Sequence, residues 1–211
     1  MPTRVKICGL TEVSDLEMIC AAGVDAVGFN LYPASPRFVP LPRLNELLTA
    51  LPPFVEPVAV CVSRPYLEVR AALAAWPRLV TVQMHGELEE IDGPYIPAFA
   101  PRTADDLCRI DTYLQRCRPL AVLVDGYTAG LHGGTGQCAP WELLQGWRPR
   151  VPLILAGGLT PENVGQAIHR LRPYAVDVAS GVEKQPGRKC ADKVRRFLDA
   201  VRQAEASVSD E

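Results

Sequence analysis

Cys8 and Asp125 are two side chains that can move protons, and each stands at the end of a short apolar run in the sequence. A thiol can act as a base once it is ionised, and a carboxyl can act as an acid when its pKa is raised. Such a pair can move protons across a bound substrate. The spacing alone favours a plainer interpretation, because a single cysteine after a strand usually packs and a single aspartate there usually caps a helix or loop.

Small residues follow the last two apolar runs, with Gly157 and Gly158 after one run and Ser180 and Gly181 after the other. Glycines let backbone N–H groups approach an anion, and a helix N-terminus adds the positive end of its dipole. Each turn alone can be a simple strand-to-helix connection. The two together, after neighbouring strands, are typical of a phosphate site, so we expect a small phosphorylated molecule as the binding partner.

Arg37 and His85 are two further candidates for substrate contacts. Arg37 lies on a proline-stiffened loop after the second apolar run, where a guanidinium can bind a carboxylate or simply lie at the surface. His85 follows the fourth run, either as a substrate contact or as a structural histidine. The chain has three histidines, and its seven cysteines form no C-x-x-C pair, so we expect no metal site and no disulfide framework.

The composition indicates one globular domain without nucleic acid or membrane partners. The 211 residues include 22 Lys and Arg against 24 Asp and Glu, a formal net charge of −2, and 48% of them are hydrophobic. This length can bury a sufficient core, and the balanced charge argues against a phosphate backbone as the main partner. The first residues contain no apolar signal segment and no stretch reaches the length of a membrane span, so we expect a cytoplasmic location.

Eight short apolar runs, separated by segments of helical spacing, must position these side chains. Most runs are continuously apolar, which is typical of strands covered on both faces. Eight such alternations without a linker predict one α/β domain, a (β/α)8 TIM barrel over residues 1–203, whose site lies at the carboxyl ends of the strands. An open doubly wound sheet is the alternative, but the turn after the first run lacks the G-x-G-x-x-G pattern. The expected strands are 5–8, 26–30, 57–62, 79–83, 95–99, 120–125, 152–156 and 174–179.

The helical segments have recognisable ends. We expect Thr11 and Thr160 to cap two helices, and further helices at 41–51, 66–76, 103–117 and 191–201. Between Met84 and Pro94 the crossover is near the minimum of roughly 10 to 12 residues, so the fourth helix should be shortened. Residues 204–211 are small, polar and acidic, which predicts a frayed C-terminal tail. The glycine-rich segment 131–137 is either a lid over the site or a flexible loop.

The motifs at the strand ends resemble those of phosphoribosylanthranilate isomerase, in the same order along nearly the whole chain. Seven motifs at matching positions are far more specific than any one of them. Pro140 departs from the family pattern where an acidic residue is usual, and Pro97 departs from it where a lysine is common; Pro97 also removes a backbone donor, so the fifth strand is expected to be short or bulged. The motifs are KICGLT at 6–11, GFNLYP at 28–33 with SPR at 35–37, VQMHGE at 82–87, LVD at 123–125, GGTG at 133–136 with Trp141, AGGLTPEN at 156–163 and VDVASGVE at 176–183.

The resemblance implies an Amadori rearrangement in tryptophan biosynthesis. It converts N-(5-phosphoribosyl)anthranilate into 1-(2-carboxyphenylamino)-1-deoxyribulose 5-phosphate, without metal or organic cofactor. On this sequence Asp125 matches the general acid that opens the ribose ring, and Cys8 matches the general base that removes the C2 proton. Arg37 matches the residue that binds the anthranilate carboxylate. Gly157, Gly158, Ser180 and Gly181 fall in the phosphate loops.

These roles require particular electrostatics. An aspartate with an ordinary pKa near 3.9 is a poor acid, so burial must favour the protonated form of Asp125. A thiol with an ordinary pKa of about 8.5 is a modest base, so we expect positive charge, from Lys6 or from the bound iminium, to favour the Cys8 thiolate.

Three alternatives differ from this interpretation. The isomerase of histidine biosynthesis should show an aspartate in place of Cys8, and a pentose-phosphate epimerase should show metal-binding His and Asp pairs. A catalytically silent barrel that binds only a phosphorylated ligand or a partner protein need not keep both Cys8 and Asp125. The chain is expected to be a monomer or a homodimer.

Overall fold

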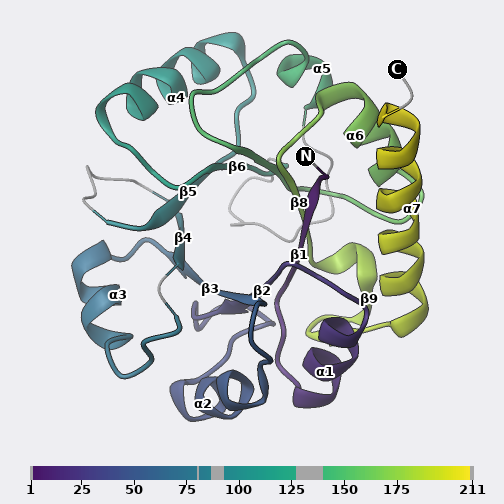
Figure 1. The fold of residues 1–211 in the computed structure, drawn as a ribbon. Coiled ribbons are helices and arrows are strands. Elements are labelled where there is room, and N and C mark those ends of the chain that lie inside the picture. Colours follow the sequence, from purple (N-terminus) through teal and green to yellow (C-terminus); the bar gives the residue numbers. More distant parts are fainter. Residues whose placement is uncertain (1, 80, 87–92, 127–139, 210–211) are drawn as a thin grey trace.

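The computed structural model describes residues 2–79, 81–86, 93–126 and 140–209, and they form a closed barrel of eight parallel strands. Figure 1 shows the ring of strands with the helices around it. The strands follow one another in chain order, and β8 pairs with β1 to close the ring. The predicted TIM barrel is confirmed. The strands are β1 (Arg4–Cys8), β2 (Ala26–Asn30), β3 (Glu56–Val62), β4 (Thr81–His85), β5 (Tyr95–Phe99), β6 (Val122–Val124), β7 (Leu153–Leu155) and β8 (Ala175–Val178).

The alternation of side chains along each strand separates two environments. In β1, Val5 and Ile7 belong to the large apolar cluster shared with the helices, whereas Lys6 and Cys8 lie on the opposite face, inside the barrel. A second, smaller cluster fills the barrel between β5 and β8 with apolar side chains. This second cluster consists of Ile96, Ala98, Ala121, Leu123, Ile154, Ala156 and Ala175.

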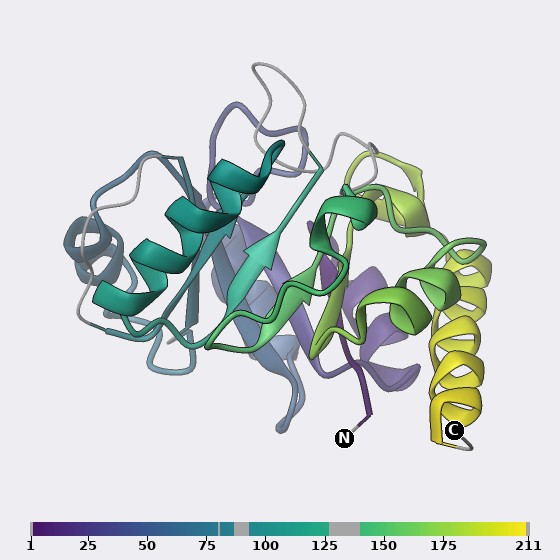
Figure 2. The ribbon, with the colours of Figure 1, turned by 90° about the horizontal axis from the view of Figure 1, so that it is seen from above.

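The helices cover the outside of the barrel. Figure 2 shows α4 across the front and α7 along one side. In the described ranges no helix is both long and apolar enough to cross a membrane. The helices are α1 (Val13–Ala21), α2 (Leu41–Ala50), α3 (Tyr66–Ala72), α4 (Ala104–Arg116), α5 (Trp141–Leu144), α6 (Val164–Leu171) and α7 (Ala191–Ser209); between β8 and α7 lie the 3-10 turn η1 (Ser180–Val182) and a hairpin of β9 (Glu183–Gln185) and β10 (Arg188–Lys189).

Two predicted helix caps are wrong, because both threonines serve loops instead. Helix α1 begins after Glu12, and the Thr11 hydroxyl donates a hydrogen bond of 2.7 Å to the carbonyl of Gly187. Helix α6 begins at Val164, later than predicted, and the Thr160 backbone N–H donates to the side chain of Asn163. By contrast, helix α4 begins beside the predicted start at residue 103, and Thr103 caps it within a reciprocal capping box.

The frayed tail predicted from Ala204 is wrong for residues 204–209, because α7 continues to Ser209. The apolar spacing of the helix extends one step beyond Val201, so that Ala204 is buried. Its Cβ packs near Gly165 of α6. The side chains of Thr3 and Glu205 are hydrogen-bonded, which joins the two ends of the chain.

Two further expectations concern the segment around β5. This strand runs from Tyr95 to Phe99, as predicted, and Pro97 aligns with Met84 of β4 in an uninterrupted parallel register, so the proline does not shorten the strand. The shortened fourth helix was predicted between β4 and β5. Residues 87–92 and the glycine-rich segment 131–137 lie outside the described residues.

The filled interior of the barrel predicts a large stability effect for Leu123→Ala. Leu123 is wholly buried, so its truncation should lower the free energy of unfolding by about 2 to 5 kcal/mol. The matched control is Leu120→Ala, because Leu120 is 50% exposed and its loss should change the value by less than about 0.5 kcal/mol. Urea denaturation followed by circular dichroism measures both, and equal effects would contradict the packing of the interior.

Candidate active site

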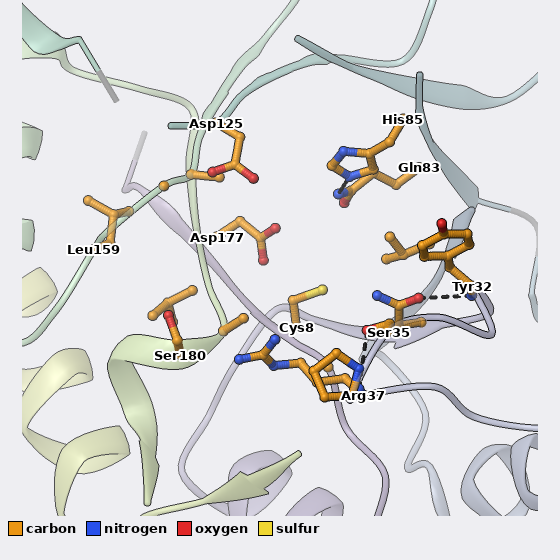
Figure 3. A pocket seen from close by; sticks show the side chains of 18 of the residues that line it. Cys8, Tyr32, Ser35, Arg37, Gln83, His85, Asp125, Leu159, Asp177 and Ser180 are labelled. Atoms are coloured by element: carbon orange, nitrogen blue, oxygen red, sulfur yellow. Dashed lines mark hydrogen bonds between the residues drawn. The ribbon is translucent and has the colours of Figure 1, made fainter. Parts of the chain in front are cut away.

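A pocket lies at the carboxyl ends of the strands, where the fold brings together residues far apart in the sequence (Figure 3). Parallel strands that close into a barrel all end at one face, so the residue after each strand faces a shared space. Of the sequence candidates, Gly181 is not among the lining residues, although its neighbour Ser180 is. The candidates that line the pocket are Cys8, Arg37, His85, Asp125, Gly157, Gly158 and Ser180.

Cys8 lies beside a buried ion pair. The Lys6 ammonium and the Asp177 carboxylate approach to 2.9 Å, and both side chains are less than 10% exposed. Burial raises the pKa of the Cys8 thiol, and the opposing effects of Lys6 and Lys189 do not cancel it. Lys6 lowers the pKa of Cys8, as expected, but burial outweighs this effect. Cys8 is therefore a neutral thiol in the ligand-free site.

Asp125 has the environment that a general acid requires. It is only 9% exposed, and burial raises its pKa to about 6, with a smaller contribution from Asp177. The backbone N–H of Gly126 donates to one carboxylate oxygen at 2.7 Å and lowers the pKa, but it does not offset the burial. Figure 3 shows Asp125, Asp177 and Cys8 directed into the same pocket.

Arg37 reaches the pocket from the loop after β2. Its backbone N–H donates to the Ser35 hydroxyl at 3.1 Å, which fixes the turn. Its guanidinium donates from Nε and Nη2 to the two oxygens of Glu183, at 3.0 and 2.8 Å. This internal partner was not predicted from the sequence. Among the described residues, Nη1 on the other edge of the fork takes no partner, so that edge is the one that can receive a ligand carboxylate.

The glycine loops after β7 and β8 pack too closely for any side chain. A Cβ on Gly157 would lie 2.1 Å from the backbone N of Gly126, and a Cβ on Gly181 would lie 1.9 Å from the carbonyl oxygen of Leu159. The side chain of Asn163 braces the first loop, since its amide donates to the carbonyl of Gly158 at 2.9 Å. The loops therefore present backbone rather than side chains to the pocket, as an anion site requires.

Two buried acceptors in the pocket were missed by the sequence analysis. Asp177 Oδ1 and Gln83 Oε1 receive no hydrogen bond within the described part of the chain, although both are enclosed. The amide nitrogen of Gln83 lies 2.8 Å from Nε2 of His85. Polar residues at alternate positions of otherwise apolar strands were the available signal. A ligand that carries hydroxyl groups would satisfy both acceptors.

The described residues contain no group of three or more His, Cys, Asp or Glu side chains placed to hold a metal ion. The pocket instead combines one acid of raised pKa, one thiol, one arginine and two glycine loops. The chemistry that these groups support is proton transfer on an anionic ligand.

Comparison with known proteins decides the family. The model of the N-(5'phosphoribosyl)anthranilate (PRA) isomerase family matches residues 5–200. The chain belongs to this family. A PRA isomerase from Pseudomonas aeruginosa is 43% identical over 205 residues, which are 94% of this chain and 95% of that protein. Family membership makes the chain an isomerase of tryptophan biosynthesis.

Solved structures of PRA isomerases share the fold. The enzyme from Thermotoga maritima is 36% identical, with a TM-score of 0.84, and the match covers 95% of this chain and 99% of that one. A second PRA isomerase structure, 35% identical with a TM-score of 0.81 and the same coverage, is a complex with reduced 1-(o-carboxyphenylamino)-1-deoxyribulose 5-phosphate.

The raised pKa of Asp125 predicts a pH-dependent stability penalty in this PRA isomerase family member. The folded chain holds the Asp125 proton up to about pH 6, whereas an ordinary aspartate releases it near 3.8, so stability is lost as the pH rises between these values. Asp125→Asn should therefore match the parent chain at pH 4 and exceed it at pH 7, by up to about 3 kcal/mol.

Urea denaturation at the two pH values measures this difference. Asp105→Asn, on the exposed start of α4, is measured beside it as a surface control. A difference in the free energy of unfolding between Asp125→Asn and the parent chain that stays the same at both pH values would show that burial does not disfavour the ionised carboxyl.

Proposed function

We propose that this chain converts N-(5-phosphoribosyl)anthranilate into 1-(2-carboxyphenylamino)-1-deoxyribulose 5-phosphate, with Asp125 as general acid and Cys8 as general base. The observation that carries the assignment is the pairing, in one pocket, of a carboxyl whose pKa is raised to about 6 with a thiol beside the Lys6 ammonium. Two groups of different acidity facing one ligand can supply and remove protons in turn.

The reaction proceeds in two proton transfers. Asp125 donates a proton to the ribose ring oxygen while the C1–O bond breaks and the nitrogen lone pair forms the iminium. The Cys8 thiolate then removes the C2 proton, and the electron pair neutralises the iminium to give an enolamine. The enolamine takes up a proton at C1 and loses the one on its C2 oxygen, which yields the ketose.

The proton distribution in the ligand-free site is the reverse of the one needed. Near neutral pH most of Asp125 is ionised and Cys8 is a neutral thiol, because the two pKa values lie below and above 7. Ligand binding excludes water and adds negative charge, which raises the pKa of Asp125 further. The iminium formed in the first step favours the thiolate in the second, so substrate completes the electrostatics of the site.

The remaining contacts suit the two ends and the middle of this substrate. The open edge of Arg37 binds the anthranilate carboxylate, and the loops with Gly157, Gly158, Ser180 and Gly181 bind the phosphate. The buried acceptors of Asp177 and Gln83 take hydrogen bonds from ribose hydroxyls, with His85 beside them. A related PRA isomerase forms a complex with reduced 1-(o-carboxyphenylamino)-1-deoxyribulose 5-phosphate, and this complex supports a ligand of the same kind for this chain.

The cellular location and the oligomeric state stay predictions. We propose a cytoplasmic monomer or homodimer whose partner is the small phosphorylated substrate alone. Analytical ultracentrifugation of the purified chain measures the oligomeric state directly.

Removing either proposed catalytic group should abolish most of the activity. With N-(5-phosphoribosyl)anthranilate as substrate, turnover is followed as a loss of anthranilate fluorescence, and Cys8→Ala and Asp125→Ala should each lower kcat at least about 100-fold. Cys20→Ala on α1 and Asp105→Ala on α4 are matched controls outside the pocket. No turnover by the parent chain would favour a silent phosphate-binding barrel, and full activity in both variants would refute the mechanism.

The reversed proton distribution predicts the shape of the pH profile. The productive form needs protonated Asp125 and ionised Cys8, so its population is constant between the two pKa values and falls outside them. The value of kcat/KM should therefore rise to about pH 6, stay level through neutral pH and fall only above the raised pKa of Cys8. A steady decline that begins at pH 6 would show that Cys8 does not need to ionise.

A further inference from the structure

The hairpin of β9 and β10 places a buried lysine behind the pocket. The side chain of Lys189 is 0% exposed, and its Nζ lies within hydrogen-bond distance of three oxygen atoms. They are Oε1 of Glu183 at 2.8 Å, the carbonyl of Cys8 at 2.5 Å and the carbonyl of Ala179 at 3.3 Å. Three acceptors around one nitrogen match the three donors of an ammonium group. Burial lowers the pKa of Lys189, and the ion pair with the Glu183 carboxylate opposes this effect.

Glu183 connects this lysine to the arginine of the pocket. Its carboxylate accepts both hydrogen bonds from Arg37, one from Lys189 and one from the backbone N–H of Gly187. Glu183 is only 6% exposed, so water does not compete strongly for these bonds. The carboxylate therefore fixes the plane of the Arg37 guanidinium and leaves its outer edge toward the pocket.

The charges of the three groups explain why the lysine is needed. Arg37 and Glu183 alone form a neutral pair, which would attract an anionic ligand weakly. Lys189 restores one net positive charge at this side of the pocket, in a buried position where screening by solvent is small. The hydrogen bond from Lys189 to the Cys8 carbonyl also connects these three charged residues to the end of β1.

We propose that Lys189, acting through Glu183, is a positioning residue that makes Arg37 selective for the ring carboxylate of the ligand. This inference rests on the proposed function, since it takes Arg37 as the group that meets that carboxylate. Lys189 touches no ligand itself. It hydrogen-bonds to Glu183, and its positive charge offsets the negative charge with which Glu183 would otherwise cancel that of Arg37.

The experiment compares two ligands in the parent chain and in three variants. The ligands are reduced 1-(o-carboxyphenylamino)-1-deoxyribulose 5-phosphate and the same compound without the ring carboxylate, and calorimetry gives their dissociation constants. The parent chain should prefer the carboxylated ligand. In Lys189→Met this preference should fall about tenfold or more, while the affinity for the other ligand stays within about threefold.

Lys193→Met is the matched control. This variant also removes one positive charge. Lys193 contacts the same glutamate, but its Nζ donates to the backbone carbonyl of Glu183 at 2.8 Å rather than to the carboxylate. The ligand preference should be unchanged in this control. Lys189→Gln, which is neutral but keeps a donor for the Cys8 carbonyl, is measured in parallel and carries the comparison if the methionine variant does not fold.

The outcomes separate this inference from the proposed function. An unchanged preference in folded Lys189→Met or Lys189→Gln, or an equal loss in Lys193→Met, would overturn the positioning role. Absence of turnover by the parent chain would instead overturn the proposed function. Turnover by the parent chain together with a loss of preference confined to the Lys189 variants is the result expected.

Discussion

The pairing of β1 with β8 is the interaction on which the rest of the molecule depends. Arg4 to Ile7 align with Ala175 to Val178, so the first and last strands of the barrel meet although most of the chain lies between them. The pairing closes the ring, and it also sets Lys6 opposite Asp177 inside the barrel. Cys8 is the last residue of β1, and the loop with Ser180 follows β8. Without this pairing the barrel would not close, and the side chains of the site would not meet.

The site keeps its charges in a partly unfavourable arrangement until a ligand binds. Asp125 carries a buried carboxylate whose pKa is raised, and Asp177 has an oxygen without a hydrogen bond in the described part of the chain. Burial also keeps the Cys8 thiol neutral. The unpaired oxygen of Asp177 and the ionised form of Asp125 cost stability in the free protein. A hydroxyl group of the ligand relieves the first, and proton uptake by Asp125 relieves the second. The scaffold tolerates them because the surrounding strands are fully paired and packed.

The sequence predicted the parts of the fold that depend on local pattern. The continuous apolar runs located all eight strands, although β4 lies two residues later than the predicted 79–83. The spacing after the runs located Cys8, Arg37, His85 and Asp125 in one pocket. It did not predict contacts made across the barrel. Glu183 and Lys189 lie on a short hairpin whose partners become neighbours only after the ring closes, so no local pattern indicated that they hold Arg37. The end of α7 was misjudged for a similar reason, since Ala204 is buried by packing on α6.

The hydrogen bond between Thr3 and Glu205 has a consequence for protein engineering. It places both ends of the chain at the amino-terminal face of the barrel, and Figure 2 shows the two termini on the same side. The pocket opens at the opposite face, where the strands end. A tag or a fused domain at either end would therefore stand away from substrate entry, and a short peptide joining the ends would allow new termini to be cut in a surface loop without crossing the pocket.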